Sequence, residues 1–218
     1  MFNKTILAAV AACSLFFGAT TMANAEDVKW HASLGVGSTE VEQVNGWTPN
    51  AQGSSIDLSL GHDIVTVGDV PLGIEAGVRY SRGEGSERQQ VCDKQSCGYD
   101  EYNTRTTSNP WAGKLGVYAR HPLGPVQVSA AVGVQVIQIV EGSTYDSGGK
   151  VTDSSEYTDF AVGPYWRLGV DYPVTDTWSV GVRYEHADLT RSKWSSTYGG
   201  SSDELNVNTW SVQVTNQF

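Results

Sequence analysis

The feature that most constrains this fold is the alternation of apolar and polar side chains in eight segments after residue 26. The segments are 28–37, 55–61, 72–81, 111–120, 126–136, 159–171, 178–185 and 209–218. A period of two is typical of β-strands whose two faces meet different surroundings. Each segment is about as long as a strand that crosses a bilayer at a tilt. The sequence therefore predicts an all-β domain of eight antiparallel strands.

Alternation alone does not say which face points inward, and a soluble lipocalin-like carrier with an apolar cavity for a hydrophobic ligand is the alternative. In the eight segments the apolar face holds no Asp, Glu, Lys or Arg. A lipid-facing surface requires this, because a charge there costs roughly 2–4 kcal/mol at the bilayer midplane. Ten of the eleven strand glycines lie on the polar face, with Gly113 the exception. Small residues suit the crowded interior of a narrow barrel, so the polar face is predicted to point inward.

Aromatic residues and connection lengths favour a membrane barrel. Short connections at 67–71, 121–125 and 173–177 alternate with long ones at 40–54, 84–109, 141–156 and 187–203. This is the plan of an up-and-down transmembrane β-barrel with short periplasmic turns and four long extracellular loops. Aromatic side chains at the strand ends form two predicted belts, one of Tyr80, Trp111, Phe160 and Tyr184 and one of Trp30, Tyr172, Trp178 and Phe218.

Two places fit this pattern poorly. Pro164 lies inside the sixth segment and has no N–H to donate, which predicts a bulge or a shifted register there. Beyond Val136 the alternation breaks at residues 137–139, so the outer end of the fifth strand is not fixed by the pattern.

Residues 1–25 are predicted to be a cleaved secretory signal. Lys4 supplies the positive charge, residues 5–18 form the apolar stretch, and residues 23–25 read A-x-A. Residues 10–13 also resemble a lipoprotein box, although the apolar stretch continues past it. Residues 26–218 are then the barrel, which works outside the cytoplasm.

Composition excludes two other classes of protein. No apolar run of about 18 residues occurs beyond the signal, which excludes a helical membrane protein. The formal net charge of −10 argues against a nucleic-acid partner, because phosphate binding needs clustered Lys and Arg.

The chain resembles the small outer-membrane β-barrel superfamily, which includes the opacity proteins, the OmpX/Ail-like proteins and the transmembrane part of OmpA. The resemblance covers 26–218 and rests on architecture, the A-x-A signal and the terminal aromatic Phe218. It implies a monomer in a Gram-negative outer membrane, in contact with outer-membrane lipid and lipopolysaccharide, with no cofactor and no periplasmic peptidoglycan-binding domain. In this superfamily a terminal Phe is the recognition signal for the barrel-assembly machinery. Val212, Val214 and Phe218 match that signal, whereas Asn216 departs from it.

Ten charged residues lie on the polar face, five of each sign. They are Asp57, Glu75, Asp159, Asp171 and Glu185, and Arg79, Lys114, Arg120, Arg167 and Arg183. Unpaired charges inside a narrow barrel cost several kcal/mol, so we expect a salt-bridged plug. The alternative is a narrow ion channel along the same residues. A general porin is not expected, because eight strands enclose only enough room for side chains.

Cys92 and Cys97 are predicted to form a disulfide that closes a small loop, as is usual in exported proteins. No His or further Cys lies nearby, so no metal site is expected.

His31 and Ser33 raise an enzymatic alternative. Outer-membrane lipid A deacylases use a His and a Ser at this spacing, as a base and a nucleophile. There the pair must face the lipid, whereas here both residues have the inward parity. We therefore expect no enzyme.

The long loops carry aromatic residues, which are common in binding surfaces above a rigid scaffold. They are Trp47, Tyr99, Tyr102, Tyr145, Trp194 and Tyr198. The sequence thus favours a non-catalytic role in envelope integrity or in surface binding of an extracellular ligand. The alternative is that these loops are only soluble and variable.

Overall fold

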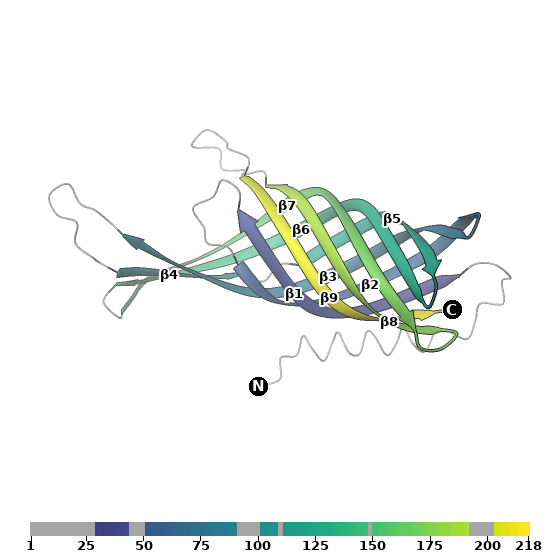
Figure 1. The fold of residues 1–218 in the computed structure, drawn as a ribbon. Helices are drawn as coiled ribbons and strands as arrows, with labels where there is room; N and C mark the ends of the chain where they lie inside the picture. Colours follow the sequence, from purple (N-terminus) through teal and green to yellow (C-terminus); the bar gives the residue numbers. More distant parts are fainter. Residues whose placement is uncertain (1–28, 44–50, 91–100, 109–110, 148–149, 192–202) are drawn as a thin grey trace.

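The computed structural model describes residues 29–43, 51–90, 101–108, 111–147, 150–191 and 203–218. They form nine antiparallel strands (Figure 1): β1 (Trp30–Gln43), β2 (Ala51–Val67), β3 (Val70–Gln90), β4 (Glu101–Ser108), β5 (Trp111–Leu123), β6 (Val126–Ser147), β7 (Lys150–Pro173), β8 (Trp178–Arg191) and β9 (Asp203–Gln217). No helix in these ranges is long and apolar enough to span a membrane.

The sheet closes on itself as a barrel of eight strands. β1 pairs with β2 and β9, and the chain of neighbours continues through β8, β7 and β6. β4 and β5 both lie between β3 and β6, so together they occupy one position in the barrel. The predicted fold class, an eight-stranded antiparallel up-and-down barrel, is confirmed.

The strands tilt steeply around the barrel axis (Figure 1). A path that starts at Trp30 of β1 can be followed from each residue to its direct partner on the next strand. After it has passed around the barrel, the path returns to β1 at Glu40, ten residues beyond Trp30. A barrel of eight strands with this stagger has an interior that side chains can fill.

Three short turns join strands at one end of the barrel, which we call the turn end. Gly68 follows β2 with a φ of 65°, and Gly124 follows β5 with a φ of 61°. Glycine adopts this left-handed conformation without steric cost, which explains its place in both tight turns. In the third turn, the Val174 amide donates to the carbonyl of Trp178. The predicted positions of the short connections are thus correct.

The polar face of the sheet points inward and the apolar face outward. On β5, Lys114 and Tyr118 are buried while Leu115 and Val117 are 65% and 55% exposed. A Cβ added to Gly133 would lie 2.2 Å from the carbonyl oxygen of Leu115, so the interior there has no room for a side chain. Gly113, the outward exception, would meet nothing within 4 Å.

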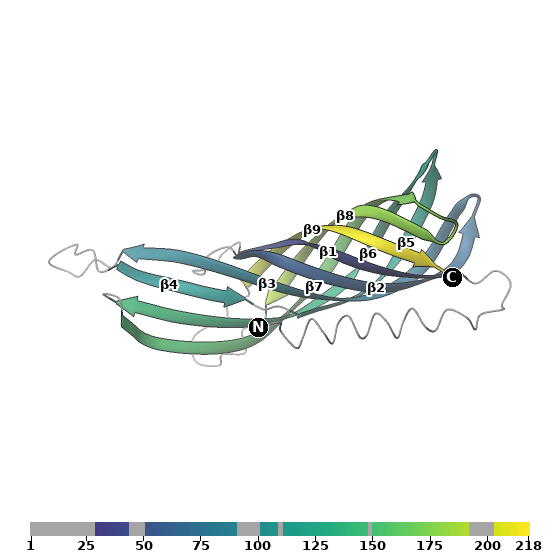
Figure 2. The same ribbon diagram turned by 90° about the horizontal axis from the view of Figure 1, so that it is seen from below.

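The strands run much further at the other end of the barrel than the sequence predicted. β3, β6 and β7 continue well into the segments expected to be loops, and β4 forms wholly within one of them. Residues 85–90, 101–108, 141–147 and 150–157 make a four-stranded extension beyond the barrel, in the order β3-β4-β6-β7. We call it the projecting sheet, and Figure 2 shows it at the end opposite the turns. The two long connections predicted at 84–109 and 141–156 thus consist largely of paired strand rather than irregular loop.

Two irregularities also differ from expectation. Pro164 causes no bulge, because the β7–β8 ladder has the same register on both sides of it and loses only the pairings of Gly163 and Pro164. Beyond Val136 the alternation continues, with Ile137 buried inside the barrel. A shifted register does occur between Asp63 and Val65 of β2, near the turn end.

Candidate functional site

A charge network crosses the middle of the barrel. Glu185 of β8 accepts hydrogen bonds from Arg79 Nη1 at 2.7 Å and from Lys114 Nζ at 2.8 Å. Lys114 Nζ also donates to Asp57 at 2.6 Å, and Arg79 Nη1 donates to Thr209. All four charged side chains are buried, so the network ties β2, β3, β5 and β8 together.

Gln135 completes this network. With its amide oriented to match its neighbours, the nitrogen donates to Glu185 at 3.1 Å and the oxygen accepts from Arg79 Nη2 at 2.7 Å. Its side chain is fully buried. A buried ion pair is stable only when the remaining lone pairs and protons are also satisfied, and Gln135 does this here.

A second group, the turn-end cluster, consists of His31, Asp63, Tyr118 and Arg120. Arg120 Nη2 donates to both carboxylate oxygens of Asp63, at 2.7 and 2.6 Å, and the Tyr118 hydroxyl donates to Asp63 at 2.5 Å. His31 packs edge-on against Tyr118, with 4.8 Å between ring centroids. The register shift in β2 lies directly after Asp63.

Four further charged side chains lie inside the barrel with different partners. Arg167 Nη2 donates to Glu75 at 2.5 Å, and the Tyr165 hydroxyl donates to the other oxygen of Glu75. Asp171 accepts from the amide of Gln213 at 2.7 Å. Arg183 donates to the hydroxyls of Ser33 and Ser59, and among the described residues no carboxylate lies within salt-bridge distance of it.

The structure describes nine of the ten charged side chains that the sequence placed in the lumen, and all nine are buried. The side chain of Asp159 lies outside the described part. Sequence reasoning left Asp63 out of the charge network, although it has the same parity as Asp57. It also gave no role to Tyr118, Tyr165 and Gln135, which share the inward parity and supply the hydrogen bonds around the charges.

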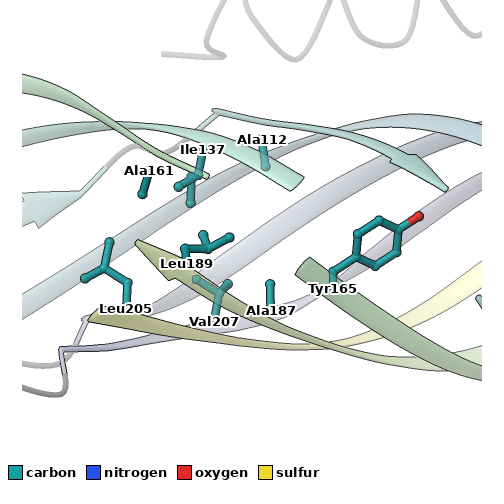
Figure 3. Packing of buried hydrophobic residues seen from close by; sticks show 8 residues of the cluster. All are labelled: Ala112, Ile137, Ala161, Tyr165, Ala187, Leu189, Leu205 and Val207. Carbon is teal, nitrogen blue, oxygen red and sulfur yellow. The ribbon is translucent and has the colours of Figure 1, made fainter. Parts of the chain in front are cut away.

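An apolar cluster lies in the lumen, and Figure 3 shows its side chains. The strand registers place it on the side of the charge network away from the turns. We call it the apolar plug, and it consists of Ala112, Ile137, Ala161, Ala187, Leu189, Leu205 and Val207, with Tyr165 beside it. Each of these side chains is at most 5% exposed. The sequence analysis expected polar residues along the whole inward face. The inward positions that follow Glu185 on β8 and precede Thr209 on β9 are instead apolar and belong to this cluster. Charges and apolar side chains therefore follow one another along the lumen.

The pair of residues that raised the enzymatic alternative lies inside the barrel. His31 is 3% exposed and Ser33 is 2% exposed. The Ser33 hydroxyl lies 2.8 Å from that of Thr215 and accepts from Arg183. Neither side chain faces the surrounding lipid, which a deacylase of the expected kind requires.

The loop candidates are only partly described. Tyr102 and Tyr145 belong to strands of the projecting sheet, where Tyr102 pairs with Gln89 and Tyr145 with Thr104. Trp47, Tyr99, Trp194 and Tyr198 lie outside the described residues. So do Cys92 and Cys97, which fall in the connection between the paired ends Gln90 and Glu101.

Comparisons with solved structures return barrels of low sequence identity. A major outer membrane protein from Thermus thermophilus is 13% identical, with a TM-score of 0.53, over 88% of this chain and 100% of that one. Ail, the attachment invasion locus protein of Yersinia pestis, is 11% identical, with a TM-score of 0.49, over 87% and 98%. The outer membrane enzyme PagL is 15% identical, with a TM-score of 0.38, over 85% of this chain and 98% of that one.

No curated protein sequence matches the chain. A family model for the outer membrane protein beta-barrel domain matches residues 9–218, which is nearly the whole sequence. Membership of this family implies a place in the outer membrane of a Gram-negative bacterium. The closed barrel, its outward apolar face and this match lead to one conclusion: the chain belongs to the family of outer membrane protein β-barrel domains.

Proposed function

We propose that this protein is a non-catalytic, non-conducting anchor that displays the projecting sheet outside the cell to bind an extracellular protein. The observation that carries the proposal is the contrast between the two ends of the molecule. The lumen holds a paired charge network and an apolar plug, while four strands continue past the barrel as a sheet.

The backbone of the projecting sheet supports binding by strand addition. The β2–β3 ladder ends at Gln52 and Glu84, and the β7–β8 ladder ends at Ala161 and Arg191. Beyond these pairs, the described ladders of residues 85–90 and 150–157 use only one side of each strand. A strand edge with free N–H and C=O groups is a template for an extended segment of another chain.

Other parts of the proposal concern the membrane. The outward apolar band is proposed to contact outer-membrane lipid and lipopolysaccharide, and the barrel to act as a monomer that contributes to envelope integrity. Phe218 is proposed as the signal for the barrel-assembly machinery; its amide donates to the carbonyl of Trp30, which joins the C-terminus to β1.

The test is to trim the projecting sheet without touching the barrel. In one variant, residues 85–106 and residues 143–155 are each replaced by an Asn-Gly turn. Lipid vesicles carrying the mature protein or the variant are passed over immobilised collagen, fibronectin and laminin. We expect retention of the full protein on one of these surfaces and its loss in the variant, whose barrel stays compact in cold SDS. Equal retention of both, or no retention on any surface, would contradict the proposal.

A further inference from the structure

Outside the barrel, four polar side chains form a hydrogen-bonded group on the outward face of β8 and β9. His186 Nδ1 lies 2.7 Å from Asn208 Oδ1, and His186 Nε2 lies 3.0 Å from Asp188 Oδ1. The Tyr184 hydroxyl donates to the same Asn208 oxygen at 2.8 Å. Both imidazole nitrogens thus lie within hydrogen-bond distance of side-chain oxygens, which fixes the orientation of the ring. We call Tyr184, His186, Asp188 and Asn208 the outward polar group.

An aromatic surface lies directly beside this group. Trp166 of β7 contacts Tyr184 at 5.3 Å and His186 at 5.6 Å between centroids, and Tyr184 contacts Trp210 of β9 at 4.6 Å. These rings lie on three adjacent strands because Trp166 pairs with His186 and Tyr184 pairs with Trp210. Trp210 is 62% exposed and Trp166 is 39% exposed, so ring surface is free to meet a ligand.

The position along the barrel places this surface in the outer leaflet. His186 lies eight residues beyond Trp178, which begins β8 at the turn end. For strands tilted by about 40°, that is roughly 20 Å along the barrel axis, near the far edge of an apolar band about 25 Å tall. At this depth the polar molecules that reach the outward face are the headgroups of outer-leaflet lipids.

The side chains of the outward polar group form hydrogen bonds with one another and do not need a lipid partner for this. The group still presents exposed polar atoms to a ligand. The Asp188 side chain is 64% exposed, whereas that of His186 is only 22% exposed. The imidazole is held on both sides and packed against Trp166, so its orientation is fixed before any ligand arrives. Fixed polar groups next to an aromatic surface reduce the ordering cost of binding.

We propose that this surface is a binding site for the saccharide headgroup of an outer-leaflet glycolipid. The C–H faces of a sugar ring lie against Trp210 and Trp166, whose ring faces carry partial negative charge. The sugar hydroxyls donate to the Asp188 carboxylate and bond the amide of Asn208. The group holds the Asp188 carboxylate and no Lys or Arg, which favours hydroxyl groups over phosphate as the recognised chemistry.

The experiment uses the full mature barrel in detergent and two probes, lipopolysaccharide and its soluble, deacylated oligosaccharide. Binding is measured by titration for the unchanged protein, for Asp188→Ala and for Trp210→Ala. We expect each substitution to weaken binding of both probes by about tenfold, through loss of a charge-assisted hydrogen bond or of the stacking surface. Trp111→Ala is the matched control, because Trp111 belongs to a separate aromatic contact with Tyr80 on β3 and β5.

Cold-SDS mobility confirms that each variant has folded, and phosphatidylglycerol micelles serve as a sugar-free lipid. Loss of oligosaccharide binding in both variants but not in Trp111→Ala supports the site. Equal affinity in all four proteins overturns it. So does an equal effect of the variants on phosphatidylglycerol, because the surface would then contact lipid without recognising sugar. None of these results depends on the projecting sheet, so they test this site separately from the proposed function.

Discussion

Arg79 and Glu185 join two strands that are not neighbours in the sheet, with Arg79 Nη1 lying 2.7 Å from Glu185 Oε1 across the interior of the barrel. Glu185 also accepts from Lys114, so one carboxylate balances two buried cations. Glu185→Gln would leave both cations short of a partner. We expect it to lower the free energy of unfolding by roughly 3–5 kcal/mol. Urea unfolding in detergent measures the change, and Asp188→Asn on the outer surface, which alters an exposed carboxylate, is the control. Equal losses in the two variants would show that the charge network does not stabilise the barrel.

Arg183 provides a contrast within the lumen, since its described partners are the hydroxyls of Ser33 and Ser59. Replacing a buried charge by an apolar side chain of similar length costs little when no opposite charge is left behind. We expect Arg183→Met to be much less destabilising than Arg79→Met, which would leave Glu185 with one cation fewer. The same urea titration compares them, and a larger loss for Arg183→Met would refute this account of the interior.

Replacing glycine by alanine is expected to affect the stability of the barrel differently on its inward and outward faces. A Cβ on Gly133 would lie 2.2 Å from the Leu115 carbonyl oxygen and 2.5 Å from the Cα of Gly116, both backbone atoms that cannot move aside. Gly133→Ala is expected to destabilise the barrel by about 1–3 kcal/mol. Gly113→Ala, which meets open space outside, should change stability by no more than about 0.5 kcal/mol. Similar values for the two variants would mean that the faces are not as described.

The disulfide between Cys92 and Cys97 remains a prediction. Thiol titration of the denatured, unreduced mature protein should find no reactive thiol, because the only other cysteine, Cys13, lies in the predicted signal. Two reactive thiols per chain would rule the disulfide out.

The alternation of side chains was enough to predict the barrel, because a closed sheet between lipid and a narrow lumen imposes opposite demands on its two faces. It also placed residues such as Glu75 and Arg167 inside, since parity alone decides this once the face is assigned. The pairing between them could not be predicted. It depends on the stagger of the strands, which brings side chains of β3 and β7 together across the lumen.

The outer half of the molecule was harder to predict for two reasons. Residues 82–90 and 101–108 are rich in polar residues on both faces, so their pattern is that of a loop although they pair as strands. The apolar plug does not follow the rule that polar side chains point inward and apolar ones outward, because Leu189 and Leu205 are apolar and point inward. The predicted strands ended at residue 185 and began again at residue 209, so Leu189 and Leu205 fell outside them.

The most direct test of the proposed non-conducting anchor is a measurement of ion conductance through the mature barrel in a planar lipid bilayer. The charge network and the apolar plug lie one after the other along the lumen, so we expect no unitary current steps at any applied voltage. Cold-SDS mobility of the same preparation shows that the barrel is folded. Unitary steps whose size changes when Arg79 is replaced by Glu would contradict the account and identify the lumen as a narrow channel.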